Sequence, residues 1–260
     1  MFKSRSTKIF VILMMVTWIT CIYNCHGKIP NKIYGGRPVN SEAEFPFVVS
    51  LQFRESHYCG ASILTEYFII TAANCVLLET SPMVYVSNIK VHMIFERENY
   101  NEEVIYSVSY ILPHEKYDTR KSSIHDLALL KLETPILSHT DEINAVLPTS
   151  YVRGTMSIGT VGWKNSGNLN FLIMTVESEN TCRLIYVNFN FRRIIQKCAT
   201  TIYENSGFSQ GDGGCPVVRG KNIHGIISLY FPQKPRNIIF TDIYSHVNWI
   251  VSTMLIYNSQ

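Results

Sequence analysis

The chain has 260 residues, of which 46% are hydrophobic, and its 23 basic and 20 acidic side chains give a formal net charge of +3 at pH 7. Lys3, Arg5 and Lys8 supply this excess, because residues 1–27 contain no acidic side chain and the rest of the chain is electrically neutral. Bulk charge therefore gives no indication of binding to nucleic acid or to an anionic membrane, and neither partner is expected. The length and apolar content suffice for one large domain or two small ones.

The N-terminus has the pattern of a secretory signal peptide. Three basic residues precede the apolar run IFVILMMVTWITCIY at residues 9–23, and small or polar residues follow it. This run is shorter than the about 20 apolar residues of a membrane span, which favours a cleaved signal over a signal anchor. We expect a signal peptide at residues 1–27, a short propeptide at 28–32 and one domain at 33–260, in a secreted, extracellular protein.

Short runs rich in β-branched and aromatic residues dominate the rest of the chain, separated by Gly, Pro, Asn and Asp. This pattern is typical of all-β proteins with closed or sandwiched antiparallel sheets. One helix is expected, near the C-terminus, where SHVNWIVSTMLI places Val247, Ile250, Val251 and Met254 on one face that packs against the body of the protein. The expected strands lie in FPFVVSLQF, SILTEYFIIT, NIKVHMIF, EVIYSVSYIL, LALLKL, SIGTVGW, FLIMTVES, PVVRG, IHGIISLYF and IIFTDIY.

Several short motifs resemble, in the same order, those of the trypsin and chymotrypsin family of serine endopeptidases. The motifs are IYGG, HYCGASIL, TAANC, HDLALLKL, VGW, SQGDGGCP, GIIS and HVNWI, and they extend from residue 33 to about residue 252. The resemblance implies two antiparallel six-stranded β-barrels, roughly at residues 45–145 and 146–245, followed by the C-terminal helix.

The catalytic triad of this family joins a serine nucleophile, a histidine base and an aspartate that orients the histidine. The resemblance places Asn74 at the histidine position, Asp126 at the aspartate position and Gly213 at the serine position. An amide cannot accept a proton near neutral pH, and glycine has no side chain with which to attack. The resemblance therefore implies an inactive homologue, a pseudoenzyme whose former oxyanion loop contains Gly211 and Gly213.

The specificity pocket implied by the resemblance is also altered. Gly207 occupies its floor, where trypsin-like members use an aspartate to pair with Lys or Arg, and Phe208 lies beside it. Ser228 and Tyr230 belong to the opposite wall. We expect the two aromatic rings to fill the pocket, although a ring that turned outward would leave it open.

The activation machinery is better preserved. In this family, cleavage before an I-x-G-G motif creates an amino group that pairs with the aspartate preceding the catalytic serine. Ile33 and Asp212 match these two positions, and Lys32 would direct a trypsin-like enzyme to the Lys32–Ile33 bond. The alternative is that Asp212 is retained only as part of the fold.

Five cysteines follow the predicted signal peptide. The resemblance pairs Cys59 with Cys75 and Cys182 with Cys198, which leaves Cys215 as a free thiol. Cys215 is interpreted as a small buried residue or an intermolecular disulfide partner, with a substitute nucleophile as the less favoured alternative. His125 is expected on the surface, facing away from Asp126, because neighbours in an extended strand point to opposite faces.

The leading functional hypothesis is a secreted homologue that acts by binding, as a cofactor, decoy or scaffold in an extracellular proteolytic system. Its partner would be a protein, for example a protease or a protease substrate. One alternative is an active endopeptidase with displaced catalytic residues, or a thiol hydrolase that uses Cys215. Another is a bulk secreted protein without a specific partner. No metal and no cofactor are expected.

Overall fold

The computed structural model describes residues 33–78, 84–96, 101–118, 123–137, 143–163, 167–187 and 189–258. The signal peptide and propeptide predicted at residues 1–32 lie outside these ranges. Strands account for most of the described secondary structure, as the alternation of β-branched runs and turn residues predicts.

The first barrel is a closed, antiparallel sheet of six strands. Around the barrel the strands follow the order β2 (Val48–Phe53), β3 (Ser56–Ile63), β4 (Phe68–Thr71), β9 (Ala128–Leu132), β8 (Asn101–Pro113) and β7 (Lys90–Glu96). Fully buried Leu51, Ile63, Ile69 and Leu130 fill its interior. Two short strands, β5 (Leu77–Leu78) and β6 (Val84–Tyr85), pair outside the barrel.

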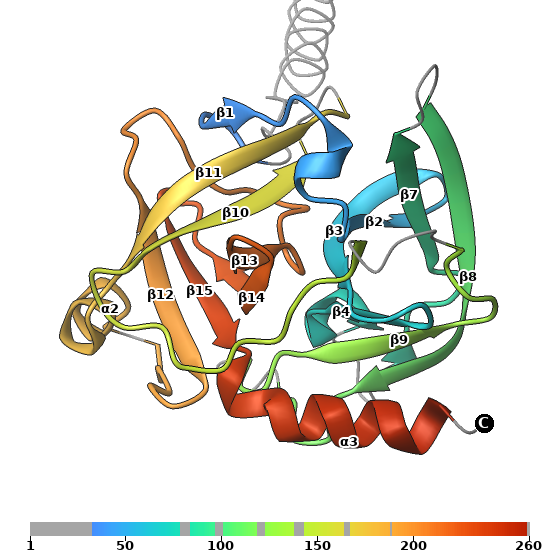
Figure 1. The fold of residues 1–260 in the computed structure, drawn as a ribbon. Coiled ribbons are helices and arrows are strands. Elements are labelled where there is room, and N and C mark those ends of the chain that lie inside the picture. Colours follow the sequence, from blue (N-terminus) through green and yellow to red (C-terminus); the bar gives the residue numbers. More distant parts are fainter. Residues whose placement is uncertain are drawn as a thin grey trace, which may run out of the picture. The chain divides into compact units, whose positions relative to one another are not determined.

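The second barrel also has six antiparallel strands, because β11 pairs with both β10 and β12 and so closes the sheet. Its strands are β10 (Ser157–Trp163), β11 (Leu169–Val176), β12 (Gln196–Thr201), β13 (Pro216–Arg219), β14 (Asn222–Tyr230) and β15 (Asn237–Asp242). The short strand β1 (Arg37–Pro38) pairs with β11 along the edge opposite β10. The two barrels lie side by side in Figure 1, which confirms the predicted fold class.

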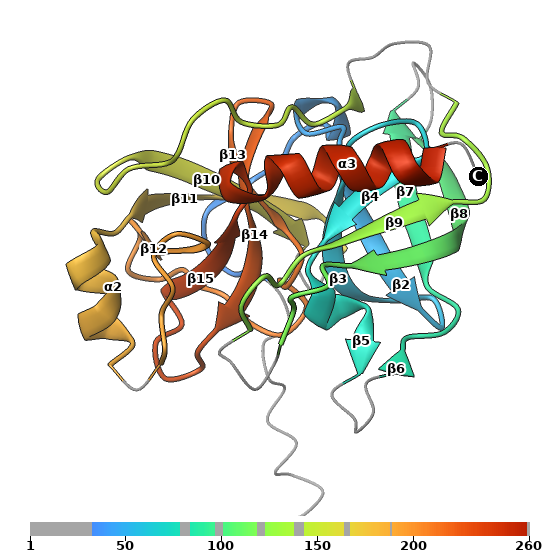
Figure 2. The same ribbon diagram turned by 90° about the horizontal axis from the view of Figure 1, so that it is seen from below.

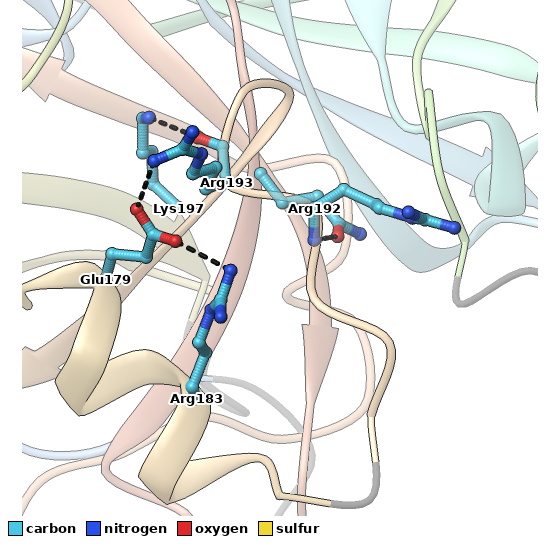
Figure 3. A network of polar contacts seen from close by, with 6 residues as sticks. Glu179, Arg183, Arg192, Arg193 and Lys197 are labelled. Atoms are coloured by element: carbon cyan, nitrogen blue, oxygen red, sulfur yellow. Dashed lines mark hydrogen bonds and ion pairs between the residues drawn. The ribbon is translucent and has the colours of Figure 1, made fainter.

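A second helix, α2 (Glu179–Ile185), was not predicted, and neither was strand β12. Ser178 caps α2, since its side chain accepts the N–H of Thr181. Glu179 pairs with Arg183 one turn later and with Arg193 of the following loop, as Figure 3 shows. At seven residues, α2 is too short to give a clear 3.6-residue periodicity.

The C-terminal helix α3 (Val247–Asn258) follows a short 3-10 helix, η5 (Tyr244–His246). It packs as expected through Ile250, which is fully buried, and through the half-buried Val247 and Met254. The prediction for Val251 is wrong, because its side chain is 39% exposed. Trp249 and Tyr257 pack against the core instead, so the buried face is rotated from the expected one.

Helix α3 runs along the first barrel and is attached to it near its last residues (Figure 2). The buried Lys131 of β9 donates from Nζ to the carbonyl oxygen of Tyr257 at 2.6 Å. A cation at the C-terminal end of a helix is favourable, because the last carbonyl groups lack intrahelical partners. None of the helices in the described part of the chain combines the length and apolar character needed to cross a membrane.

Candidate active-site cleft

Asn74 lies at the centre of a hydrogen-bonded group that joins the two barrels. It belongs to the 3-10 helix η2 (Ala73–Cys75) after β4, and its backbone N–H donates to Asp126 Oδ1 at 2.8 Å. Its side-chain Nδ2 donates to Asp126 Oδ2 and to the carbonyl oxygen of Ser228 in β14, both at 2.8 Å. Both side-chain amide hydrogens are therefore used, and only the Asn74 Oδ1 atom is left to face an incoming group.

Asp126 is completely buried, and its carboxylate is held by several donors. Besides the two bonds from Asn74, the Ser228 hydroxyl donates to Asp126 Oδ2, and the Thr241 hydroxyl donates to the Asp126 backbone carbonyl at 2.8 Å. Removing a buried carboxylate from water is costly unless such partners replace its hydration. These bonds explain how the aspartate remains buried without a histidine beside it.

Gly213 faces Asn74 across the cleft. A Cβ atom built on Gly213 would lie 3.7 Å from Asn74 Oδ1 and 3.6 Å from Cys75 Sγ, which are ordinary contacts. Space for a side chain therefore exists at this position. The loop before it turns at Gly211, whose φ of 100° favours glycine. Within the described part of the chain, the N–H groups of Gly211 and Gly213 donate to no protein acceptor.

A cleft of about 980 Å³ surrounds these groups and receives residues from both barrels. Asn74, Gly211 and Gly213 line it together with a mostly apolar wall. The other lining residues are Phe53, Ser56, Tyr58, Cys59, Cys75, Leu78, Tyr85, Val86, Ser87, Gln210, Ser228, Leu229 and Tyr230. Large, mainly apolar clefts with a few converging polar groups are the usual binding sites of proteins.

The residues predicted for the specificity pocket divide into two groups. Ser228 and Tyr230 line the cleft, whereas Gly207 and Phe208 do not. Phe208 is only 2% exposed, so its ring points into the protein. A Cβ atom at Gly207 would lie 2.5 Å from the Tyr34 hydroxyl oxygen and 2.6 Å from the Pro235 carbonyl oxygen. The surroundings of Gly207 are therefore already occupied.

The predicted activation residues Ile33 and Asp212 are in direct contact. The backbone nitrogen of Ile33 donates to Asp212 Oδ1 at 2.9 Å, and both residues are buried. Asp212 Oδ2 accepts the N–H of Ser209 at 2.8 Å, so the carboxylate is held from two sides. Gly162 makes room for the Ile33 side chain, since a Cβ atom there would lie 2.7 Å from Ile33 Cδ1. Lys32 lies outside the described residues.

The cysteines pair as the resemblance implies. Disulfides join Cys59 to Cys75 and Cys182 to Cys198, and Cys215 is free. Cys215 is completely buried, which favours the alternative of a small buried residue over that of an intermolecular disulfide partner. Burial raises the pKa of the Cys215 thiol well above its ordinary value, with the nearby Asp212 charge adding to the effect.

The prediction of a surface position for His125 is wrong, because the residue is half-buried. Its φ of 54° lies in the left-handed region, so the argument from an extended strand does not apply. The ring stacks on His114, with ring centroids 4.5 Å apart, and its Nδ1 lies 3.0 Å from His246 Nε2. These contacts hold the His125 ring, which does not line the cleft, and therefore disfavour a role as a base there.

Sequence reasoning also missed His57, which supports the glycine loop. Its Nε2 atom lies 3.0 Å from the Gly211 carbonyl oxygen, its Nδ1 atom lies 2.8 Å from the Ser50 hydroxyl, and its ring packs against Trp163 with centroids 4.7 Å apart. The HYC motif contains this histidine, but only the fold reveals that it contacts a loop far along the chain.

Two closed six-stranded barrels with a cleft between them define a trypsin-like serine protease fold, and comparison with known proteins agrees. The family model described as Trypsin matches residues 33–250, and the chain belongs to this family. Duodenase-1 of Bos taurus is 31% identical, with 88% of this chain and 92% of the relative covered. Putative trypsin-6 of Homo sapiens is 29% identical (86% and 90% covered), and Trypsin of Sus scrofa is 28% identical (86% and 96% covered).

Proposed function

We propose that this protein is a secreted, non-catalytic member of the family that acts by binding other proteins. The observation that carries the proposal is the state of Asn74. Its amide group uses both hydrogens to hold Asp126 and the Ser228 carbonyl, and it faces a glycine where a nucleophile would be needed. This arrangement favours a cleft that binds other molecules without catalysing a reaction.

The chemistry of these residues supports the proposal quantitatively. Losing a Ser–His pair costs on the order of a millionfold in turnover and leaves about a thousandfold acceleration over water from the oxyanion hole and substrate binding. The amide oxygen of Asn74 cannot take the place of an imidazole base, because an amide is not protonated near neutral pH. Turnover by this cleft would therefore be negligible on a physiological timescale.

Neither Cys215 nor His125 is placed to substitute for the missing groups. Cys215 would need an exposed, deprotonated thiol, but its sulfur is buried and the pKa of the thiol is raised. His125 would need to reach the cleft, but it contacts His114 and His246. The alternative of displaced catalytic residues is therefore disfavoured.

The cleft retains features suited to a polypeptide segment. Exposed Leu78 and Tyr85 and the half-buried Tyr230 offer apolar surface, and the N–H groups of Gly211 and Gly213 are available for a carbonyl oxygen. We infer that a segment of an extracellular protease, or of a protease substrate, binds here. The protein would then act as a cofactor, decoy or scaffold within a proteolytic system.

Secretion and activation belong to the same proposal. Residues 1–27 have the signal-peptide pattern, and the two disulfides are typical of an oxidising compartment. Cleavage after Lys32 would give Ile33 a charged amino group opposite Asp212. The contact already present between Ile33 and Asp212 supports such a switch, which would order the glycine loop for binding without any need for catalysis.

Charge substitutions in the cleft test the binding proposal. A double variant, Leu78→Glu with Tyr85→Glu, places carboxylates on two exposed lining residues, and Leu184→Glu on α2 is the matched control away from the cleft. Each protein is crosslinked in the secretory fluid of its source. We expect the wild type and Leu184→Glu to recover the same specific partner and the double variant to lose it. Equal recovery by all three, or no specific partner at all, would contradict binding through the cleft.

A further inference from the structure

Three histidines from distant parts of the chain meet beside the C-terminal helix. His114 follows β8, His125 directly precedes Asp126, and His246 ends η5. One ring nitrogen of each lies within 4.8 Å of the others, and His125 Nδ1 lies 3.0 Å from His246 Nε2. Imidazole nitrogens at this spacing suit a transition-metal ion such as zinc.

The spacing of the ring nitrogens is close to that of a metal site. Zinc binds histidine nitrogen at about 2.0–2.1 Å in tetrahedral geometry, which places ligand atoms about 3.3 Å apart. The His125–His246 pair, at 3.0 Å, is close to this spacing, whereas the His114 ring stacks on His125 at an interplanar angle of 15° and has to turn before its nitrogen points at the same ion. We propose that His114, His125 and His246 bind one zinc ion, with water in the fourth position.

Hydrogen bonding orients His246 for this role. Its Nδ1 atom lies 2.7 Å from the Asp242 carbonyl oxygen, to which only a protonated nitrogen can donate. The Nε2 atom then carries the lone pair, and this is the atom that faces His125. A histidine ligand of a metal ion commonly donates its other N–H to a carbonyl oxygen, which holds the ring and its tautomer in place.

His114 lies between Lys116 and Glu115. In the structure, His114 Nδ1 accepts the N–H of Lys116 at 3.1 Å. Binding through Nε2 would move the ring proton to Nδ1, which would give up the bond from Lys116 and turn toward the Glu115 carboxylate oxygen, now 3.7 Å away. The Trp249 indole N–H donates to the same carboxylate oxygen at 2.9 Å and so holds it in position. A carboxylate behind a histidine ligand is a frequent second partner in zinc sites.

The backbone of His125 is a further geometric observation. His125 is held at a φ of 54°, a conformation that costs energy for a non-glycine residue and often marks a functional position.

No sequence motif indicates this metal site, because the ligands do not follow one another at a recognisable spacing. A bound ion would join the end of β8, the loop that carries Asp126 and the segment before α3. It would therefore stabilise the attachment of the C-terminal helix to the first barrel. This inference is independent of the proposed binding function, since it concerns different residues.

Zinc titration of the secreted protein tests the site. Asn is a suitable replacement for His125, because it lacks the imidazole and tolerates a positive φ. His92→Gln is the matched control, since His92 lies in β7 and contacts Glu103. We expect the wild type and His92→Gln to bind one equivalent of Zn²⁺ and to unfold at a higher temperature with it. In His125→Asn the affinity should fall by more than about tenfold.

A spectroscopic measurement on the wild type keeps the test independent of the folding of any variant. Extended X-ray absorption of the zinc-loaded protein should give three imidazole nitrogens and one further light ligand. Absence of saturable binding, a first shell with fewer than three imidazoles, or an equal affinity in His125→Asn would overturn the proposal. The cluster would then be an aromatic packing contact between α3 and the first barrel.

Discussion

Asn74 donates to both carboxylate oxygens of Asp126, through its backbone N–H to Oδ1 and through its side-chain Nδ2 to Oδ2, each at 2.8 Å. The resemblance to the family assigns Asn74 and Asp126 to the histidine and aspartate positions of the triad. In the function that we propose, their contact is a structural one, because the buried carboxylate is supplied with donors and an amide takes the place of a base.

This contact predicts that Asp126 matters for stability even without catalysis. Asp126→Ala removes the acceptor for the Asn74 amide and for the Ser228 hydroxyl, and these groups stay buried or half-buried. Leaving such donors unsatisfied should lower the free energy of unfolding by about 2–4 kcal/mol. Urea unfolding measures this free energy. The control variant Glu133→Ala, at an exposed position directly after β9, should change the free energy of unfolding by less than about 0.5 kcal/mol. Equal stability of both variants would contradict a structural role for Asp126.

Restoring the triad should not restore trypsin-like cleavage. The double variant Asn74→His with Gly213→Ser has room for the serine, since a Cβ atom at Gly213 meets only ordinary contacts. We still expect little cleavage after Lys or Arg, because Gly207 supplies no carboxylate and Phe208 is packed into the protein. Chromogenic Lys and Arg substrates measure the rate, with the same variant carrying Asp126→Ala as the control for contaminating proteases. Efficient cleavage that depends on Asp126 would show that the pocket argument is wrong.

The contact between Ile33 and Asp212 predicts a response to cleavage after Lys32. A new amino group at Ile33 would face Asp212 Oδ1, at the place where the backbone nitrogen already lies 2.9 Å away. We expect cleaved protein to show slower hydrogen exchange in residues 207–213 than the intact chain, because a charged pair holds the loop more firmly than an amide does.

Substitution of the carboxylate checks the cause of this response. Asp212→Asn keeps the side-chain shape and an acceptor for Ser209 but removes the charge, so cleavage should no longer slow exchange in the loop. Glu204→Ala, at an exposed position nearby, should respond like the wild type. An identical response of Asp212→Asn would mean that the pair is not a switch.

Cys215 predicts a loss of stability in alkali. Burial raises the pKa of its thiol in the folded state, so the thiol stays protonated there while the unfolded chain loses its proton above about pH 8.5. The stabilising effect of the neutral thiol is therefore fully present below that pH and is lost as the pH rises toward the folded-state pKa. Urea unfolding over this range should show a steeper decline for the wild type than for Cys215→Ala. An equal decline in the stability of the two proteins would contradict a raised pKa of the buried Cys215 thiol.

The fold could be predicted because its signals are numerous and repeated along the chain. Ten strand-like runs and eight motifs in a fixed order agree on one architecture, so an error in a single run changes little. Helix α2 and strand β12 were missed because α2 has only seven residues and β12, QKCATT, contains only polar and small residues. Val251 was misplaced because a one-residue rotation of the helical face cannot be read from periodicity alone.

The candidate site could be predicted only for residues that lie within a recognised motif. Asn74, Asp126 and Gly213 lie in such motifs, and the structure brings them together as expected. His125 was misjudged because its positive φ depends on the tertiary structure. The contact of His57 with Gly211 and the meeting of His125 with His246 join residues far apart in the chain, and no local pattern records such contacts.

Hydrolysis of a mixed peptide library by the purified protein tests the central claim most directly. The library is incubated with the intact chain and with protein whose cleavage at Lys32–Ile33 has been verified. The account predicts no hydrolysis in either state beyond that of a matched Asp126→Ala preparation. Hydrolysis that begins only after the cut, and that Asp126→Ala abolishes, would show that the cleft around Asn74 and Gly213 is a working active site.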